Sequence, residues 1–425
     1  MNKFKPLAAV FAPYPLSDRI TLYRDFQAAL FVGVFSGLAM PLVGVVGRKL
    51  GMDSGQFAIM NTFMAVGFLL NLWFGYASAK GNTAAWVFWP SVVARAAVAL
   101  AAFSTGPLSF LLIFSFYNFM SVLTGPAYSS IMRSNYSDMN RGRLMGNIRI
   151  LMQIVSAVGA ALAAWFMHAY PAGYRVLFPV SAAFGIAGSF AFFKIKPRLK
   201  AAASAPGDPA PAKNTMSFRT SVQTIRADKP FLAYMGLFFI IILPGKMIIP
   251  LEPIRLVDEL HMDYAAAGLI QGTIPFIGNI LGYFFYSRAL KRTNPFKLML
   301  ISLCIALPRN LGIALAAESV HLIPGAFLSA FGNAGGDLLS HFTILYFSGP
   351  EKIALYMGVH ASLIGLRTLI GPIIGIFLYG TLKISLSNLY MIVFILQSIG
   401  IIGFALFIRH SALKPKDRVR SRQET

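Results

Sequence analysis

The chain has 425 residues, of which 56% are hydrophobic and only 12% are charged, and its mean hydropathy is +0.66. Soluble domains carry about 25% charged residues, so this composition excludes a soluble globular protein. The formal net charge of +22 would favour nucleic acid as a partner in a soluble protein. In a membrane protein the same charge indicates basic cytoplasmic loops, and we expect no nucleic-acid partner.

Apolar residues gather in repeated blocks of about twenty, the length that crosses ~30 Å of hydrocarbon as a helix. Strands of a membrane barrel would alternate apolar and polar residues, which these blocks do not. The sequence therefore predicts an all-α integral membrane protein with twelve transmembrane helices. We expect the spans at residues 26–47, 55–77, 84–104, 107–130, 143–167, 174–194, 231–251, 264–287, 296–316, 320–347, 353–378 and 386–408.

A different kind of sequence separates the sixth span from the seventh. It contains KIKPRLKAAASAPGDPAPAK, which is basic and rich in proline and alanine, as is typical of a flexible linker. We therefore expect two six-helix bundles, residues 1–194 and 230–425, joined by a cytoplasmic linker at 195–229. The second bundle would end in a basic cytoplasmic tail.

Basic residues are distributed unevenly between the two sides of the predicted bundle. If the N-terminus is cytoplasmic, five Lys and Arg residues fall in outer loops and five inside spans, which leaves 27 of the 37 on the cytoplasmic side. Cytoplasmic loops of membrane proteins carry this excess of Lys and Arg. We therefore expect both termini in the cytoplasm.

The two halves of the chain share a local pattern. Span five reads RLMGNIRILMQIVSAVG and span eleven reads LYMGVHASLIGLRTLIG. Gly146 matches Gly358, and Gly159 matches Gly371, at a constant offset of 212 residues. We interpret this as an internal duplication of six helices.

The stretch from Gly125 to Arg149, GPAYSSIMRSNYSDMNRGRLMGNIR, carries a family resemblance. Together with the layout of six spans, a linker and six spans, it resembles bacterial members of the major facilitator superfamily. The superfamily's Gly-x3-Asp-Arg-x-Gly-Arg-Arg loop is reduced here to GYASAKGNTAAW, which lacks the Asp and the arginines. The chain would then belong to a divergent branch.

The resemblance implies a transporter that works by alternating access. Helices one, four, seven and ten would line a central cavity, and helices three, six, nine and twelve would form an outer scaffold. It also implies a multi-pass protein of the plasma (bacterial inner) membrane, with a small-molecule substrate and the lipid bilayer as partners. We expect a monomer.

Charged groups inside spans are costly and usually face the protein interior or a water-filled cavity. Away from their ends, the spans hold five basic residues, namely Arg95, Arg149, Lys246, Arg309 and Arg367, and one central acid, Asp337. This excess of positive charge favours an anionic substrate.

Lys246 and Arg367 are the principal candidates for substrate contact. Lys246 follows Pro244 on the predicted seventh helix, and the alternative is that its amine reaches for the outer interface. Arg367 offers a forked donor suited to carboxylate or phosphate, with His360 seven residues earlier on the same face. The alternative for Arg367 is a structural ion pair with Asp337.

Asp337 is the candidate for proton coupling, because His341 lies one turn further along the same helix face and a carboxylate and an imidazole can exchange a proton. Tyr117 and Asn118 in the fourth span, and Arg149 in the fifth, are further substrate-binding candidates. Arg95 and Arg309 occupy comparable depths in spans three and nine. For these two we expect a structural role, in which each bonds to carbonyls of a neighbouring helix.

Enzyme signatures are absent from the sequence. It contains no HExxH, no GxSxG, no Walker A loop and no Cys/His cluster with metal-ligand spacing. We therefore expect no enzyme activity, no cofactor and no metal. The leading hypothesis is a secondary transporter of a small anionic organic solute, with proton coupling as an option. The alternatives are an exporter of amphipathic or lipid-like compounds and, from another class, a membrane sensor or scaffold that does not transport.

Overall fold

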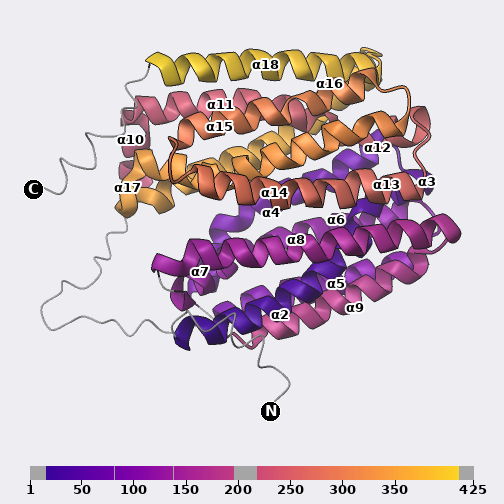
Figure 1. The fold of residues 1–425 in the computed structure, drawn as a ribbon, viewed down its shortest axis with the longest axis horizontal. Coiled ribbons are helices and arrows are strands. Elements are labelled where there is room, and N and C mark those ends of the chain that lie inside the picture. The colour runs from indigo at the N-terminus through magenta and orange to yellow at the C-terminus, as the bar shows by residue number, and fades with distance from the viewer. Residues whose placement is uncertain (1–15, 81, 137, 196–217, 411–425) are drawn as a thin grey trace, which may run out of the picture. The chain divides into compact units, whose positions relative to one another are not determined.

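The computed structural model describes residues 16–410 apart from residues 81, 137 and 196–217 (Figure 1). All regular elements within these residues are helices. Ten helical segments of the described chain are long and apolar enough to cross a membrane. The two other predicted spans, 55–77 and 320–347, coincide with helix α4 and with the first part of helix α17. The predicted all-helical membrane fold is therefore confirmed.

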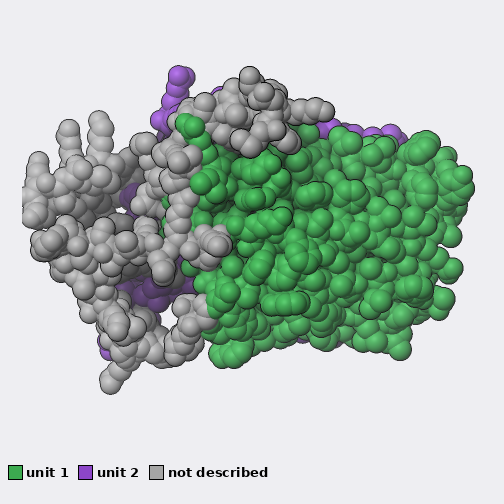
Figure 2. Space-filling model, turned by 90° about the horizontal axis from the view of Figure 1, so that it is seen from below, with its two compact units in different colours: residues 1–215, 256–258, 262–276 green, residues 216–255, 259–261, 277–425 purple. Residues whose placement is uncertain are grey.

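Contacts between residues divide the chain into two compact units, which Figure 2 colours separately. Unit 1 comprises residues 1–215, 256–258 and 262–276, and unit 2 comprises residues 216–255, 259–261 and 277–425. Two short stretches that follow the seventh predicted span are thus assigned to unit 1. The domain boundaries expected from the sequence, at 194 and 230, stay a prediction, because a division by contacts does not show that either part folds alone.

In unit 1 the helix α2 packs against α8 and α9, α4 packs against α6, and α5 packs against α9 (Figure 1). The elements are α2 (Leu16–Ala39), η1 (Met40–Leu42), α3 (Val43–Lys49), α4 (Ser54–Lys80), α5 (Thr83–Leu100), η2 (Ala101–Phe103), α6 (Pro107–Leu123), α7 (Gly125–Asn135), α8 (Asp138–Ala169), α9 (Tyr174–Phe193), α13 (Tyr264–Gly268) and η4 (Leu269–Thr273).

In unit 2 the helix α11 packs against α17 and α18, and α15 packs against α17. The elements are α10 (Phe218–Ala227), α11 (Lys229–Ile248), α12 (Glu252–Ile254), α14 (Ile274–Ala289), α15 (Pro295–Ala306), α16 (Pro308–Leu315), η5 (Ser319–Leu322), α17 (Ile323–Ile376), η6 (Phe377–Thr381) and α18 (Leu386–His410). The first three residues of α14 belong to unit 1, and η3 (Arg255–Glu259) is divided between the units.

Prolines explain why several spans consist of two helices. Pro41 separates α2 from α3, Pro126 lies at the start of α7, and Pro308 opens α16. Proline has no backbone N–H and cannot continue the hydrogen bonding of the preceding turn.

Helix starts are capped by side chains, as where the Asp228 carboxylate accepts a hydrogen bond from the backbone N–H of Phe231.

Helix α17 contains two predicted spans and reverses its direction between them. On a straight helix Thr343 and Arg367 would be roughly 36 Å apart, at 1.5 Å per residue. They instead contact residues one turn apart on α11, since Thr343 hydrogen-bonds Tyr234 and Arg367 hydrogen-bonds the carbonyl of Phe238. The two parts of α17 therefore both lie against α11, in agreement with the separate spans predicted at 320–347 and 353–378.

The predicted linker is only partly described. Residues 196–217 lie outside the described part of the chain, so the flexible character expected for them stays a prediction. The end of the predicted linker forms the helix α10 (Phe218–Ala227), which the proline- and alanine-rich composition of the preceding residues did not indicate.

Glycines at matching positions of the two halves make matching close contacts. A Cβ atom added to Gly159 on α8 would lie 3.3 Å from the Cα of Gly37 on α2. One added to Gly371 on α17 would lie 2.5 Å from the Cβ of Lys246 on α11. The fifth span of each half (α8, and the second part of α17) thus approaches the first span of the same half (α2, and α11) at the matching glycines 159 and 371. This supports the internal duplication.

Candidate functional site

Helix α11 carries Lys246 near its C-terminal end, two residues after Pro244. The side chain is half-buried, and within the described residues its amine has no hydrogen bond and no ion pair. An ammonium group away from water and without a partner is costly, so this position is a strong candidate for binding an anion.

A polar cavity of about 260 Å³ lies beside Lys246 inside unit 2. Its walls come from α11, α15, α16, α17 and α18. Apolar residues such as Ile241 and Leu303 form part of the wall. The polar side chains that line it are Lys246, Arg309, Asn310, Ser329, Asn333 and Gln397.

Neutral amides form a short hydrogen-bond chain along this cavity. The Nδ2 of Asn310 donates to the Oε1 of Gln397 at 2.6 Å, and the Nε2 of Gln397 donates to the carbonyl of Ile241 at 3.0 Å. On α17, the Nδ2 of Asn333 donates to the Oγ of Ser329 at 3.2 Å. Each amide keeps at least one donor or acceptor position for a ligand.

The second cation at the cavity, Arg309, is already neutralised. Its guanidinium forms an ion pair with the carboxylate of Glu252, just beyond the end of α11. The sequence predicted that Arg309 would bond to helix carbonyls; in the structure it instead binds this carboxylate, which lies 57 residues away in the sequence. The cavity therefore has one uncompensated charge, that of Lys246.

Arg95, the counterpart of Arg309 in the first half, belongs to unit 1. Its Nη1 donates to the carbonyl of Gly185 at 2.6 Å and to the hydroxyl of Ser189, both on α9. These contacts join α5 to α9, as expected for a structural role of Arg95.

Arg367 is buried, with only 3% of its surface exposed. Its Nη1 donates to the carbonyl of Phe238 at 3.1 Å, and the ring of Phe238 lies 5.5 Å from the guanidinium. The Nε has no hydrogen-bond partner, and no carboxylate of the described residues forms an ion pair with Arg367. The structural ion pair with Asp337, which the sequence left as the alternative, is therefore not formed.

His360 packs against Phe238 of α11, the residue that Arg367 also contacts. Its ring is 5.8 Å from that of Phe238, it is buried, and its Nδ1 has no hydrogen-bond partner. Lys246 packs against Gly371, which lies one turn beyond Arg367 on α17. We call Lys246, His360 and Arg367 the basic cluster; in the described structure no acidic side chain is paired with any of its members.

Asp337 and His341 are both exposed on the first part of α17. The Asp337 carboxylate accepts a hydrogen bond from the hydroxyl of Tyr283 at 2.9 Å. The Nδ1 of His341 lies 3.3 Å from the backbone carbonyl of Asp337. Neither side chain is therefore enclosed by the described residues around it.

The remaining predicted site residues belong to unit 1. The ring of Tyr117 packs 5.9 Å from that of Phe35, and the Nδ2 of Asn118 donates to the carbonyl of Met60 at 3.2 Å. These contacts join α6 to α2 and α4. Arg149 is exposed on α8.

Asp25 is a buried acid whose importance the sequence did not indicate. The first predicted span begins at residue 26, just after Asp25, but α2 begins at Leu16, so Asp25 lies inside the helix with 3% of its surface exposed. It accepts a hydrogen bond from the Tyr136 hydroxyl at 2.9 Å, and no cation of the described residues pairs with it. Burial and then the nearby Asp25 carboxylate raise the pKa of Tyr136 well above its usual range, so Tyr136 remains a donor.

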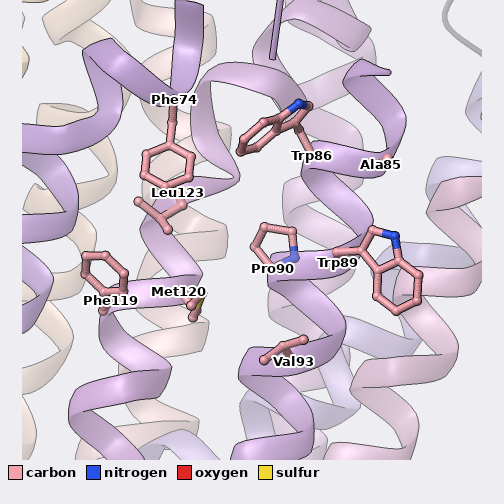
Figure 3. A pocket seen from close by; sticks show the side chains of 9 residues that line it. All are labelled: Phe74, Ala85, Trp86, Trp89, Pro90, Val93, Phe119, Met120 and Leu123. Atoms are coloured by element: carbon pink, nitrogen blue, oxygen red, sulfur yellow. The ribbon is translucent and has the colours of Figure 1, made fainter. Parts of the chain in front are cut away.

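Unit 1 also contains an apolar pocket of about 420 Å³ between α4, α5 and α6 (Figure 3). In Figure 3, Phe119, Met120 and Leu123 of α6 face Pro90 and Val93 of α5. The complete lining consists of Phe74, Ala85, Trp86, Trp89, Pro90, Val93, Phe119, Met120 and Leu123. This pocket has no charged side chain in its wall.

Comparisons with known proteins show the fold over more than 90% of the chain and match a family model over its second half. The family model of the Major Facilitator Superfamily matches residues 231–424. A variant of the nucleoside transporter NupG has a TM-score of 0.68 at 13% identity, covering 91% of this chain and 99% of that one. No curated protein matches the sequence.

A bacterial homolog of the human lysosomal transporter Spinster is also similar, in two inward-facing structures. The unoccupied form has a TM-score of 0.64 at 13% identity, and the occupied form has 0.64 at 12%. Each alignment covers 93% of this chain and 98% of the other. At these identities the likeness shows the fold.

Proposed function

We propose that this chain, which belongs to the major facilitator superfamily of secondary transporters, carries a small organic anion across the membrane by alternating access. The family is one of transporters and not of enzymes.

The basic cluster is the observation that carries the proposal. Arg367 and His360 both lie against Phe238, Lys246 packs against Gly371 one turn beyond Arg367, and none of the three has an acidic partner among the described residues. Charges of one sign in a medium of low dielectric repel one another and lose their hydration, so a bound anion would lower their free energy. Arg367 in addition keeps a free Nε, and a guanidinium can bind a carboxylate through two parallel hydrogen bonds.

Proton coupling at Asp337 is part of the proposal. Its carboxylate is exposed and is held by the hydroxyl of Tyr283, so it can gain and lose a proton while its position is kept. We further propose that both termini face the cytoplasm, in a bacterial inner membrane. Arg149, Tyr117 and Asn118 remain candidate contacts from unit 1, although the proposal does not depend on them.

A thermal-shift screen of the purified protein tests the substrate class. The panel would contain organic anions, phosphates, amino acids, organic cations and lysolipids. A ligand at a hundredfold excess over its Kd stabilises the folded state by about 2.7 kcal/mol, so even weak substrates are detected. Stabilisation by organic anions, followed by their uptake or exchange in proteoliposomes, is the expected result. Stabilisation by cations alone would contradict the proposal.

Export of amphipathic or lipid-like compounds is the second candidate function. The apolar pocket between α4, α5 and α6 supports it, because a wall with no charged side chain suits an alkyl chain (Figure 3). In the same screen, stabilisation by lysolipids and by no organic anion would move this candidate to first place. Substitution Val93→Trp, which fills the pocket, should then reduce lysolipid binding while leaving anion binding unchanged.

A further inference from the structure

We infer that the C-terminal end of α14 binds an anionic phospholipid of the surrounding bilayer. The phosphate of this lipid contacts three basic side chains, and its acyl chain lies along two phenylalanines. The site belongs to unit 2 and shares no residue with the basic cluster or with the polar cavity. It does not depend on the identity of the transported substrate, because it requires only that the chain spans a membrane.

A pocket of about 530 Å³ at this end of α14 combines cations with aromatic rings. Among the described residues its lining consists of Phe284, Phe285, Arg288, Ala289, Lys291 and Arg292. The two phenylalanines are 51% and 45% exposed, so apolar surface is available directly beside the charges. A phospholipid presents the complementary pair of chemical groups, a phosphate and a hydrocarbon chain, in the same order.

The three cations of the pocket have no acidic partner in the described structure. Arg288, Lys291 and Arg292 are exposed, and none of them forms an ion pair with a described residue. The backbone N–H of Lys291 donates to the carbonyl of Arg288 at 3.2 Å, and that of Arg292 donates to the carbonyl of Ala289 at 3.0 Å. These bonds continue the turn, and residues three and four apart on a turn share one face. The three charges therefore lie together and favour an anion.

The side chain of Arg288 is oriented for a phosphate. Its guanidinium carbon lies 3.3 Å from the centre of the Phe284 ring. This contact covers one face of the planar group and fixes its direction. The N–H groups point outward within the plane, so they stay available for phosphate oxygens, which a guanidinium binds through two parallel hydrogen bonds. Phe284 thus positions the cation and also offers its own apolar surface.

The pocket lies at the depth where lipid head groups meet hydrocarbon. The segment Tyr264–Ala289 is long and apolar enough to cross a membrane, and Arg288 is its next-to-last residue. Phe284 lies one turn earlier, roughly 6 Å deeper along the helix axis. The cations are therefore at the level of the head groups, and the rings are at the level of the first acyl carbons. A soluble anion would match the charges but leave the rings uncovered.

Native mass spectrometry of the purified full-length protein in detergent tests the class of lipid. Phosphatidylglycerol, which is anionic, would be compared with zwitterionic phosphatidylcholine of identical acyl chains, and glycerol phosphate would be added as a soluble competitor. Each Lys or Arg near an anionic lipid surface is worth about fivefold in affinity, so we expect phosphatidylglycerol to bind about tenfold more tightly or better. Equal binding of the two lipids would overturn the inference. Displacement of the lipid by glycerol phosphate would also overturn it and identify a site for soluble phosphates.

Substitutions separate this pocket from the general attraction of a basic protein to anionic lipid. The double variant Arg288→Gln, Arg292→Gln should lose the preference for phosphatidylglycerol. The matched control is Lys297→Gln, Arg409→Gln, which removes the same charge from two exposed cations at helix ends of unit 2 that do not line the pocket. This control should keep the preference. An equal loss in the two double variants would mean that only total positive charge matters, and the pocket would be rejected.

Two single variants keep the test decisive if the double variant does not fold. Lys291→Gln changes one exposed side chain beyond the end of α14 and should weaken phosphatidylglycerol binding about fivefold, while binding of phosphatidylcholine stays unchanged. Phe284→Leu keeps an apolar surface but removes the ring that orients Arg288, so it should reduce the preference for phosphatidylglycerol. Full preference in both single variants would overturn the assignment of the phosphate to this pocket.

Discussion

Arg367 illustrates how a single buried cation can serve both stability and binding. Its Nη1 bond to the carbonyl of Phe238 joins α17 to α11, and its remaining donors have no partner among the described residues. A guanidinium keeps its charge even when buried, whereas a lysine amine in the same place can lose its proton. An arginine is therefore suited to maintain a positive potential in an apolar region.

The first prediction concerns the charge of Arg367. Arg367→Gln should weaken binding of the organic anion more than tenfold, a change above ~1.4 kcal/mol, because it removes positive charge from the basic cluster. The protein should still fold, since a glutamine amide can donate to the carbonyl of Phe238. Isothermal titration of the purified variant measures the affinity. Unchanged affinity here and in a Lys246→Gln variant would reject an anionic substrate and favour the amphipath exporter.

The second prediction concerns the coupling proton. If Asp337 carries it, Asp337→Asn should abolish net transport driven by a pH gradient and leave exchange of substrate for substrate largely intact. An amide can still accept the hydrogen bond from Tyr283 but cannot take up a proton at physiological pH. Counterflow and gradient-driven uptake in proteoliposomes measure the two activities.

Asp25 provides the comparison for that experiment. It is a buried carboxylate with a hydrogen bond from Tyr136 and no cation paired with it, so it too can hold a proton. Asp25→Asn should leave gradient-driven transport intact if Asp337 alone carries the coupling proton. The opposite pattern, with loss in Asp25→Asn and not in Asp337→Asn, would move the coupling site to unit 1.

At the scale of elements, α11 and the second part of α17 depend on glycine for their close approach. A Cβ on Gly371 would lie 2.9 Å from the backbone carbonyl carbon of Lys246, and one on Gly375 would collide with the carbonyl of Met247. Small residues at a spacing of four let membrane helices touch along their backbones. This contact holds the segment of α11 that carries Lys246.

The third prediction tests this contact. Gly371→Ala should destabilise the protein by about 1–3 kcal/mol, the usual cost of overpacking, and should also weaken substrate binding because α11 must shift at Lys246. Gly358→Ala on the same helix is the control, since an added Cβ there meets no atom within 4 Å. Thermal unfolding and ligand titration of both variants would show the difference. Equal effects of the two substitutions would mean that the contact does not position Lys246.

At the scale of the whole molecule, the distribution of Lys and Arg predicts which ends of the helices face the cytoplasm. The fourth prediction is that a cysteine in place of Asp53, in the first outer loop, reacts with an impermeant thiol reagent added to intact cells. A cysteine in place of Asp208, in the linker outside the described residues, should react only after the cells are opened. Cys304 is free and exposed, so it must first be changed to serine. Labelling of position 208 from outside would invert the proposed topology.

Much of the fold followed from local features of the sequence. A helix in lipid satisfies its backbone hydrogen bonds within itself, so the length and position of an apolar run determine a span without reference to its neighbours. For this reason the twelve predicted spans coincide with helices of the described chain, and the prolines at 41, 126 and 308 mark where spans are divided. The boundary that failed was the start of α2, because the charged residues from Asp18 to Asp25 resemble a loop in composition.

The candidate site could be predicted only as a set of residue types. The sequence alone determined that cations outnumber acids within the spans and that the chain spans a membrane repeatedly, and it predicted that its halves are related. Tertiary structure alone decided that Glu252 neutralises Arg309, that Arg367 binds a carbonyl and not Asp337, that Asp25 is buried, and that Lys246 lines a cavity with Asn310 and Gln397. The physical reason is that side-chain partners on different helices depend on which helices are adjacent and on how each helix is rotated about its axis. The spacing of residues along the sequence determines neither of these.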